Sequence, residues 1–193
     1  FGGILVNSAQ HVRIAHNLIS GNVAMGGGGG ISCQFGTDST VVIAHNLIVG
    51  NSTARPQWGG TSGGGGIYLQ DARPLIHNNT VIYNKAIGDG GGILCDGASP
   101  YLHDNIIAYN LNGGLAFKPV SYMSTEQAGP GPKLSHNDIW NNAEYDYSGM
   151  DPGEGDIAVD PEFLAPREGD FSLSRGSPCK KAGTAGSIGA DVE

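Results

Sequence analysis

Short apolar stretches alternate with segments rich in asparagine and glycine along the first 143 residues of the chain. Within each stretch of about four to six residues, apolar and polar positions alternate and β-branched residues are frequent, which is typical of β-strands. The longer 3.6-residue periodicity of an amphipathic helix is not found in this region. The pattern therefore predicts many short strands rather than a helical repeat.

Two phrases recur in turn through this region. In the first, an apolar residue is followed by asparagine three residues later and by a second asparagine five residues after that, as in IAHNLISGN (14–22). In the second, an apolar residue directly follows two or more glycines. The leading asparagines are Asn17, Asn46, Asn79, Asn105 and Asn137, and the second ones are Asn22, Asn51, Asn84, Asn110 and Asn142. Spacings of 26 to 33 residues between equivalent positions indicate a solenoid.

The predicted fold class is all-β, a right-handed parallel β-helix of about five coils. Equivalent side chains of stacked coils lie about 4.8 Å apart, so we expect two asparagine ladders in which each amide bonds to the next. The ladder asparagines themselves are expected to adopt the left-handed conformation at the corners. Three apolar rows, which begin at Val6, Ile14 and Ile19, are predicted to fill the interior. Cys33 and Cys95 belong to the first row, two coils apart and beyond disulfide reach.

The last part of the chain does not repeat and is rich in proline, glycine and aspartate. We therefore expect β-helix coils over residues 1–143 and an acidic loop with a C-terminal cap over residues 144–193, within the same domain. A solenoid must cover its last open coil, and this segment is the expected cover. The chain begins inside a glycine-glycine-apolar phrase, so we expect a fragment or a processed product whose open first coil stacks on an upstream segment or on another copy.

The net charge of −8 over 193 residues is concentrated near the C-terminus. Residues 1–143 carry 7 acidic and 6 basic side chains, whereas residues 144–193 carry 11 acidic and 4 basic ones. An acidic chain with scattered basic residues is a poor candidate for binding nucleic acid. The sequence has no run of about 20 apolar residues, so no membrane span is predicted.

The Asn-x-Ile-x-x-Asn and Gly-Gly-Gly-Ile phrases resemble those of the right-handed parallel β-helix repeat family, which has a pectate-lyase-like architecture. The C-terminal phrases DPEF, GDFSL and GSPC are similar to the tail of many bacterial secreted and surface members, although Lys180 and Lys181 stand where that tail usually has Ile-Asp. The resemblance covers nearly the whole chain. It implies an exported bacterial protein that acts at or outside the cell surface, but no single activity, because such folds serve enzymes, adhesins and inert stalks alike.

One polar row is a candidate carbohydrate-binding face. Amides beside an aromatic ring can hydrogen-bond to a sugar chain and stack on it, so a polysaccharide is one candidate partner. The alternative is a solvated polar row with an ion pair between its last two members, which adds little stability. The candidate residues, all expected to point outward, are Asn7, Gln34, Gln70, Asp96 and Lys118, with Tyr68 on the same face.

Two further groups of residues suggest metal or acid–base chemistry. The loop at 146–160 is rich in oxygen ligands of the kind that Ca²⁺ prefers, which makes a structural calcium ion the one candidate cofactor; a solvated acidic turn is the alternative. The proposed ligands are Asp146, Asp151, Glu154 and Asp156.

Five histidines accompany the leading asparagines, namely His16, His45, His77, His103 and His136. Neighbouring imidazoles could hold a metal ion, and His103 with Asp104 could act as acid and base. Because the coil spacing is too wide for tight shared ligation, we expect these histidines to be polar neighbours of the asparagine corner.

Two functions follow from the sequence. The preferred one is a non-catalytic extracellular β-helix module with a structural, adhesive or carbohydrate-binding role, which stacks end to end with further coils. The alternative is a polysaccharide lyase, epimerase or hydrolase that acts on an acidic polysaccharide. Basic residues occupy different coil positions, and acidic ligands do not accompany them in the coils, which favours the module. An enzyme would show a groove with convergent charges and perturbed pKa values.

Overall fold

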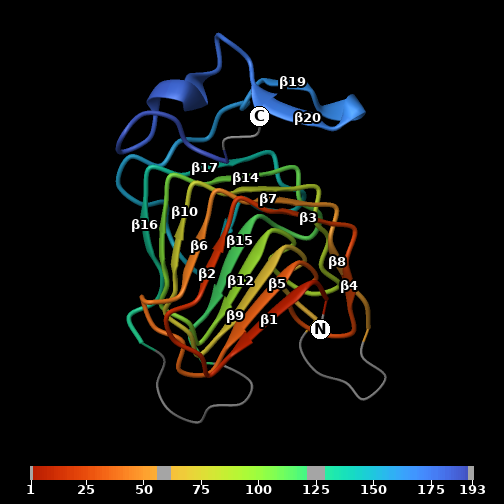
Figure 1. Ribbon diagram of the computed structural model, residues 1–193, viewed down its shortest axis with the longest axis vertical. Coiled ribbons are helices and arrows are strands. Elements are labelled where there is room, and N and C mark those ends of the chain that lie inside the picture. The colour runs from red at the N-terminus through yellow and green to blue at the C-terminus, as the bar shows by residue number, and fades with distance from the viewer. Residues whose placement is uncertain (1, 56–61, 121–128, 191–193) are drawn as a thin grey trace.

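The computed structural model describes residues 2–55, 62–120 and 129–190. Over these residues the chain forms a β-solenoid, with twenty strands and two short 3₁₀ helices. Successive strands of each coil lie in three different sheets, and each sheet collects equivalent strands from successive coils (Figure 1). The predicted all-β fold of stacked parallel coils is therefore confirmed.

Sheet A contains the strands that follow the glycines, and neighbouring strands within it are parallel. Its strands are, in order, β1 (Ile4–Asn7), β5 (Ile31–Gln34), β9 (Ile67–Gln70), β12 (Ile93–Asp96), β15 (Leu115–Lys118) and β18 (Tyr147–Ser148). The glycines before these strands allow the coils to approach closely. A Cβ atom added at Gly66 would lie 2.7 Å from the carbonyl oxygen of Gly92 and 3.1 Å from Nδ2 of Asn84, so the glycine row also makes room for the second asparagine ladder.

Sheets B and C hold the strands on either side of the leading asparagines. Sheet B consists of β2 (Arg13–Ala15), β6 (Val42–Ala44), β10 (Leu75–His77), β13 (Tyr101–His103) and β16 (Lys133–Ser135). Sheet C consists of β3 (Leu18–Ser20), β7 (Leu47–Val49), β11 (Thr80–Ile82), β14 (Ile106–Ala108) and β17 (Asp138–Trp140). A short parallel pair, β4 (Val23–Ala24) with β8 (Ser52–Thr53), extends the first two coils.

The core consists of the three predicted apolar rows, and the strand registers confirm each of them. The row that begins at Val6 continues through Cys33, Leu69, Cys95 and Phe117. The rows from Ile14 and Ile19 run to Leu134 and Ile139. These rows belong to one continuous buried cluster. Burial raises the pKa of the Cys33 thiol to about 12, so this cysteine packs as a small apolar side chain.

The left-handed corners lie one residue earlier than predicted. Positive φ angles of 51° to 57° occur at the residue before each leading asparagine, and the ladder asparagines are not among the residues with positive φ. The expectation that the asparagines themselves take this conformation is wrong. The asparagine side chain must point inward along the stack, so the preceding residue makes the turn. The residues at this first corner are His16, His45, Asn78, Asp104 and His136.

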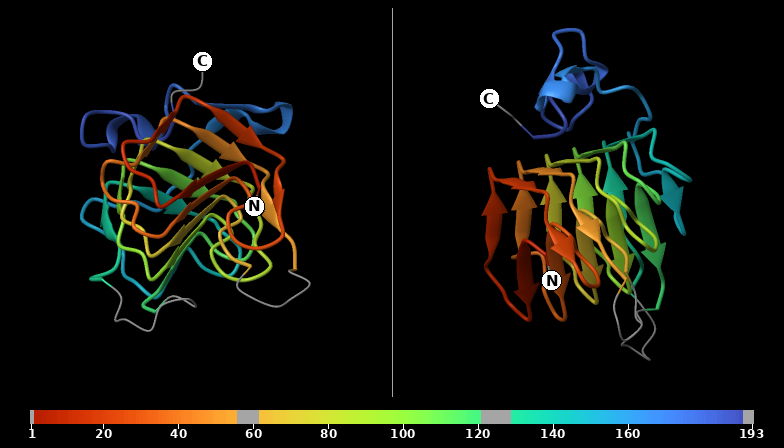
Figure 2. Two further views of the ribbon diagram at one scale, coloured as in Figure 1. Left: turned by 60° about the horizontal axis from the view of Figure 1, so that its bottom comes forward. Right: turned by 90° about the vertical axis from the view of Figure 1, so that its right-hand side faces the viewer.

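The non-repeating segment does two different things. Residues 144–157 continue the stack as a partial last coil, because β18 pairs with β15, Glu154 bridges to Ser135 and Ile157 bridges to Asp138. Residues 158–190, which we call the C-terminal strap, instead fold back along the outer face of sheet C (Figure 2). Residues 144–157 thus stack on the last full coil, whereas the strap covers the side of the solenoid.

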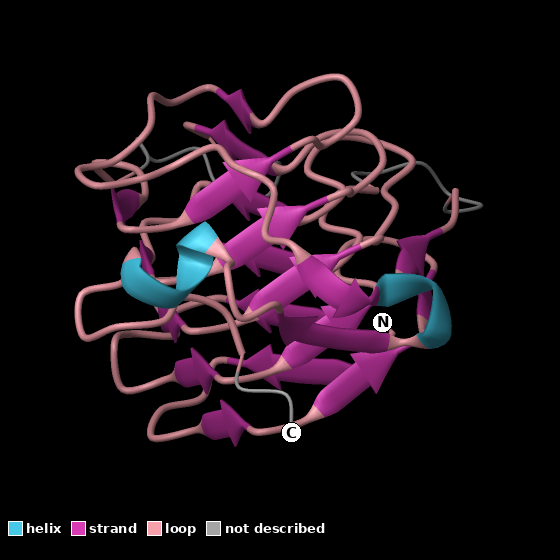
Figure 3. Ribbon diagram, turned by 90° about the horizontal axis from the view of Figure 1, so that it is seen from above, coloured by secondary structure: helices cyan, strands magenta, loops and turns pink. Residues whose placement is uncertain are grey.

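The strap contains the antiparallel pair β19 (Phe163–Ala165) and β20 (Asp170–Leu173) and the helices η1 (Pro166–Glu168) and η2 (Pro178–Lys181). Figure 3 views the molecule from above, the side that carries the strap, and shows the strap lying over the coils. Its buried side chains Phe171, Cys179 and Ile188 pack against outward-facing apolar residues of the sheet. Those residues are Leu47, Ile82, Ile106 and Ala108. The outer face of sheet C is therefore largely apolar beneath the strap, which a simple in-out alternation did not predict.

Candidate functional site

The two asparagine ladders have a direction. In each rung the backbone N–H and the side-chain Nδ2 of one asparagine donate to Oδ1 of the equivalent asparagine in the next coil, at 2.9 to 3.1 Å. The same Nδ2 also reaches a backbone carbonyl; Asn79, for example, donates to the oxygen of Ile43 at 2.9 Å. Donors therefore point toward the C-terminal end of each ladder and acceptors toward the N-terminal end.

At the C-terminal end an aspartate closes each ladder. Asn142 donates its backbone N–H and its Nδ2 to Oδ1 of Asp146, at 2.9 and 2.8 Å. Asn137 does the same with Oδ1 of Asp156, at 2.7 and 3.0 Å. The second oxygen of Asp156 accepts from the hydroxyl of Tyr147 and from the N–H of Gly153. A carboxylate only accepts hydrogen bonds, so both ladders end here.

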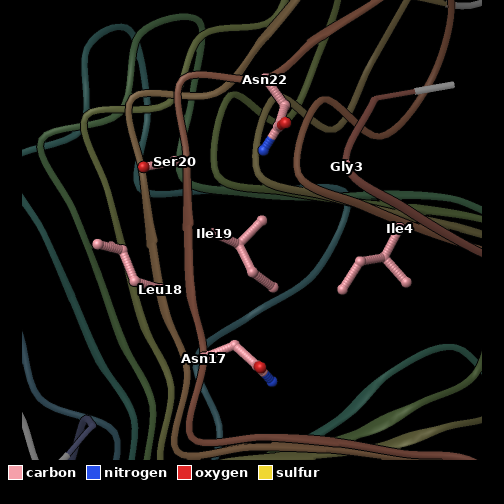
Figure 4. Close-up of a pocket in the computed structure, with 7 residues that line it drawn as sticks. All are labelled: Gly3, Ile4, Asn17, Leu18, Ile19, Ser20 and Asn22. Carbon is pink, nitrogen blue, oxygen red and sulfur yellow. The ribbon is translucent and has the colours of Figure 1, made fainter.

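At the N-terminal end both ladders stay open among the residues that the structure describes. The Oδ1 atoms of Asn17 and Asn22 receive no hydrogen bond there, and β1, β2 and β3 are edge strands of their sheets. Figure 4 shows the resulting hollow, which has a volume of about 320 Å³. It is lined by Gly3, Ile4, Asn17, Leu18, Ile19, Ser20 and Asn22.

Residues 18–34 match the family model of the Chlamydia polymorphic membrane protein repeat. This stretch runs from β3 through the Asn22 rung and the glycine run to the end of β5. It is one corner of a coil. Its pattern returns at residues 47–70, 80–96 and 106–118, whereas the last coil has no glycine run after Asn142. Neither a curated protein nor a solved structure is similar enough to the chain to count as a match. Within the described residues, no helix has the length and apolarity needed to cross a membrane.

The predicted carbohydrate row has the expected register but little exposure. Equivalent residues pair from Asn7 to Lys118 as predicted. Asn7 is exposed and Lys118 half-buried, whereas Gln34, Gln70, Asp96 and Tyr68 are each less than 9% exposed. The Tyr68 hydroxyl donates to Asp96 at 2.8 Å. A sugar chain on this face would reach Asn7 and Lys118 before any buried member, and carbohydrate binding stays a prediction.

The ion pair expected between Asp96 and Lys118 is replaced by a different one. Lys118 Nζ lies 2.8 Å from Oδ2 of Asp89, a residue of the loop that leads into β12 in the preceding coil. Both side chains are more than a third exposed, so the pair adds little stability. Loop residues thus fold toward the outer face of sheet A, which residue spacing alone did not reveal.

The four proposed calcium ligands divide into two pairs. Asp146 and Asp156 each use Oδ1 to close a ladder, whereas Asp151 and Glu154 are exposed. Across the described part of the chain, histidine, cysteine and acidic side chains do not gather in threes that could hold a metal ion. Calcium binding by this loop stays a prediction from its composition.

The histidines form a row along the corner between sheets B and C. The rings of His16 and His45 stack with centroids 4.9 Å apart, and those of His77 and His103 stack at 5.0 Å. Between the two pairs, His45 and His77 meet edge to face at 5.5 Å. The Nδ1 atoms of His77 and His103 lie 3.0 and 2.9 Å from the side chains of Asn78 and Asp104, so these two histidines lie beside the corner.

Asp104 anchors the C-terminal strap. Its two carboxylate oxygens accept hydrogen bonds from the backbone N–H of Thr184, at 2.8 Å, and from the Thr184 hydroxyl, at 2.5 Å. His103 Nδ1 lies 2.9 Å from the same carboxylate. Burial alone would raise the pKa of Asp104, but the hydrogen bonds from Thr184 and His103 outweigh it and lower the pKa. The His103–Asp104 pair is thus part of a structural contact.

A second hollow, of about 520 Å³, lies beside sheet C and was not predicted. Tyr83 and Tyr109 stack there at 5.2 Å, and Trp140 meets Tyr109 edge to face at 5.4 Å. Both tyrosines directly precede a second ladder asparagine, where the first two coils have Gly21 and Gly50. This change from glycine to tyrosine at one repeat position was the sequence signal that could have indicated the hollow.

Asp138 is a buried carboxylate between β17 and the strap. Its Oδ1 accepts from the N–H of Val159 at 3.0 Å, and the Cys179 sulfur lies 3.3 Å from Oδ2. Burial raises the pKa of Asp138 from 3.8 to about 6, against the opposing effect of these two hydrogen bonds. The charged form is therefore disfavoured in the folded chain.

We expect Asp138→Asn to change how stability depends on pH. The folded-state pKa is raised, so the carboxyl group costs stability progressively as pH rises from about 4 to about 6. The neutral amide avoids this cost, and the variant should be roughly 1 to 3 kcal/mol more stable than the wild type at neutral pH and similar to it below about pH 4. Urea unfolding at several pH values measures this. Parallel stability curves for the two proteins across that range would contradict the prediction.

Proposed function

We propose that this chain is a structural β-helix module of an exported bacterial surface protein of autotransporter-like type. The observation that carries the proposal is the pair of asparagine ladders, which run from Asn17 and Asn22 to the closing aspartates. Such a stack is a rigid rod whose length is set by the number of coils. The similarity of residues 18–34 to a polymorphic membrane protein repeat supports a location on the cell surface.

The placement of the reactive side chains supports a non-catalytic role. Asp104 holds the strap, and Asp146 and Asp156 close the ladders. Asp96 accepts a hydrogen bond from buried Tyr68. The carboxylates that looked available for acid–base chemistry therefore have structural partners. In an enzyme, such groups converge on a cleft where a substrate fits.

Surface labelling tests the proposal. Antibodies raised against the purified chain should label intact cells of the source bacterium, and protease added outside the cells should remove the label. A cytoplasmic protein, labelled only after permeabilisation, is the control. Labelling of the chain that also requires permeabilisation would contradict the proposed location. Release of unsaturated uronates or new reducing ends from acidic polysaccharides by the purified chain would contradict the structural role.

A further inference from the structure

We propose that this solenoid can be extended at its N-terminal end only. The first coil accepts a further coil of the same repeat type that has asparagine at both ladder positions. Asp146 and Asp156 prevent the chain's own C-terminal end from acting as that coil. The inference concerns the purified molecule and does not depend on its location in the cell.

The N-terminal end has the acceptors for such a partner. Oδ1 of Asn17 and Oδ1 of Asn22 occupy the positions that receive two hydrogen bonds in every later coil. An incoming asparagine would supply both donors, its backbone N–H and its Nδ2. The half-buried Ile4 at the hollow would pack against the partner's apolar row. Hydrogen bonds and apolar contacts thus select the same partner.

The C-terminal end lacks the side-chain donor of each ladder. Aspartate has nearly the same shape as asparagine, so Oδ1 of Asp146 takes the usual two bonds from Asn142. Its second oxygen then stands in place of the amide nitrogen, and a carboxylate has no hydrogen to donate. Asp156 is closed further, since the Tyr147 hydroxyl and the Gly153 N–H already bond to its second oxygen at 3.0 and 2.8 Å.

Head-to-tail contact between two copies would bring these ends together. At each ladder a carboxylate oxygen would face an asparagine Oδ1, and two acceptors buried against each other leave both without a partner. The exposed Asp151 and Glu154 add negative charge to the same end. The ladder chemistry is therefore what excludes head-to-tail contact. The proposal therefore differs from the sequence-based expectation of end-to-end stacking, which stays a prediction as far as contact between two copies is concerned.

The test is to restore the donors. In the Asp146→Asn/Asp156→Asn variant both ladder ends become amides, and sedimentation velocity should show concentration-dependent association at least about tenfold tighter than that of the wild type. The control Asp151→Asn/Glu154→Gln removes two negative charges from the same loop without entering a ladder. The wild type and this control should stay monomeric.

Two further variants keep the test decisive. Asp146→Asn alone changes a second oxygen that has no hydrogen bond among the described residues, so this variant should fold and associate even if the double variant does not fold. Adding Asn22→Ala removes an acceptor at the other end and should reverse the association. The inference is overturned if the wild type stacks head to tail, if the folded amide variants stay as monomeric as the control, or if Asn22→Ala leaves their association unchanged.

Discussion

Replacing Asn79 with alanine is expected to lower the free energy of unfolding by about 3 to 5 kcal/mol. Asn79 is fully buried in the middle of the first ladder. Its Oδ1 accepts from the N–H and the Nδ2 of Asn46, and its own Nδ2 donates to Oδ1 of Asn105 and to two backbone carbonyls. Alanine leaves the backbone N–H of Asn46 and one hydrogen of its Nδ2 buried without an acceptor, and each such group costs about 1 to 3 kcal/mol.

Asn17→Ala is the matched control for this prediction. Asn17 belongs to the same ladder, but it is exposed and its Oδ1 accepts from none of the described residues. Water can replace what the alanine removes, so the loss should be about 1 kcal/mol or less. Urea unfolding of both variants measures the difference. Equal losses at the two positions would show that the ladder does not stabilise the interior of the solenoid.

The second large effect is expected for Gly91→Ala. A Cβ atom at Gly91 would lie 2.0 Å from the carbonyl oxygen of Leu111 in the next coil. Neither backbone segment can move away without breaking the close contact of neighbouring coils. We therefore expect a loss of at least about 3 kcal/mol, measured as a lower midpoint of urea or thermal unfolding.

Gly88 provides a control in the same loop. A Cβ atom there would have its nearest neighbour at 3.4 Å, an ordinary contact. Gly88→Ala should change stability by about 1 kcal/mol or less, in either direction, because alanine also restricts the unfolded chain. If Gly91→Ala is as stable as Gly88→Ala, close coil contact is not what requires glycine at this position.

The coils could be predicted from the sequence because stacking places equivalent residues on top of one another. A row such as Ile14, Ile43 and Ile76 must be apolar at every level, so its register can be read directly from the repeat. The asparagine ladders could be predicted for the same reason.

The features that sequence analysis missed depend on segments that do not repeat. Nothing in the spacing of residues 158–190 indicates that they cover Leu47 and Ile106 on the side of the solenoid. The residue pattern of their own strands likewise did not predict that Gln70 and Asp96 are buried. The closing role of Asp146 and Asp156 could partly have been predicted from the sequence, because each occupies the position of the next ladder asparagine. Their acidity suggested a metal ligand instead.

Hydrogen exchange of the asparagine side-chain amides, followed by NMR, tests the first asparagine ladder most directly. The Nδ2 protons of Asn46, Asn79, Asn105 and Asn137 are all bonded within the first ladder. They should exchange at least about 100-fold more slowly than those of the exposed Asn7 and Asn141. Protection should extend to Asn137, whose acceptor is Asp156. If the ladder amides exchange as fast as those of Asn7, the ladders do not exist in solution.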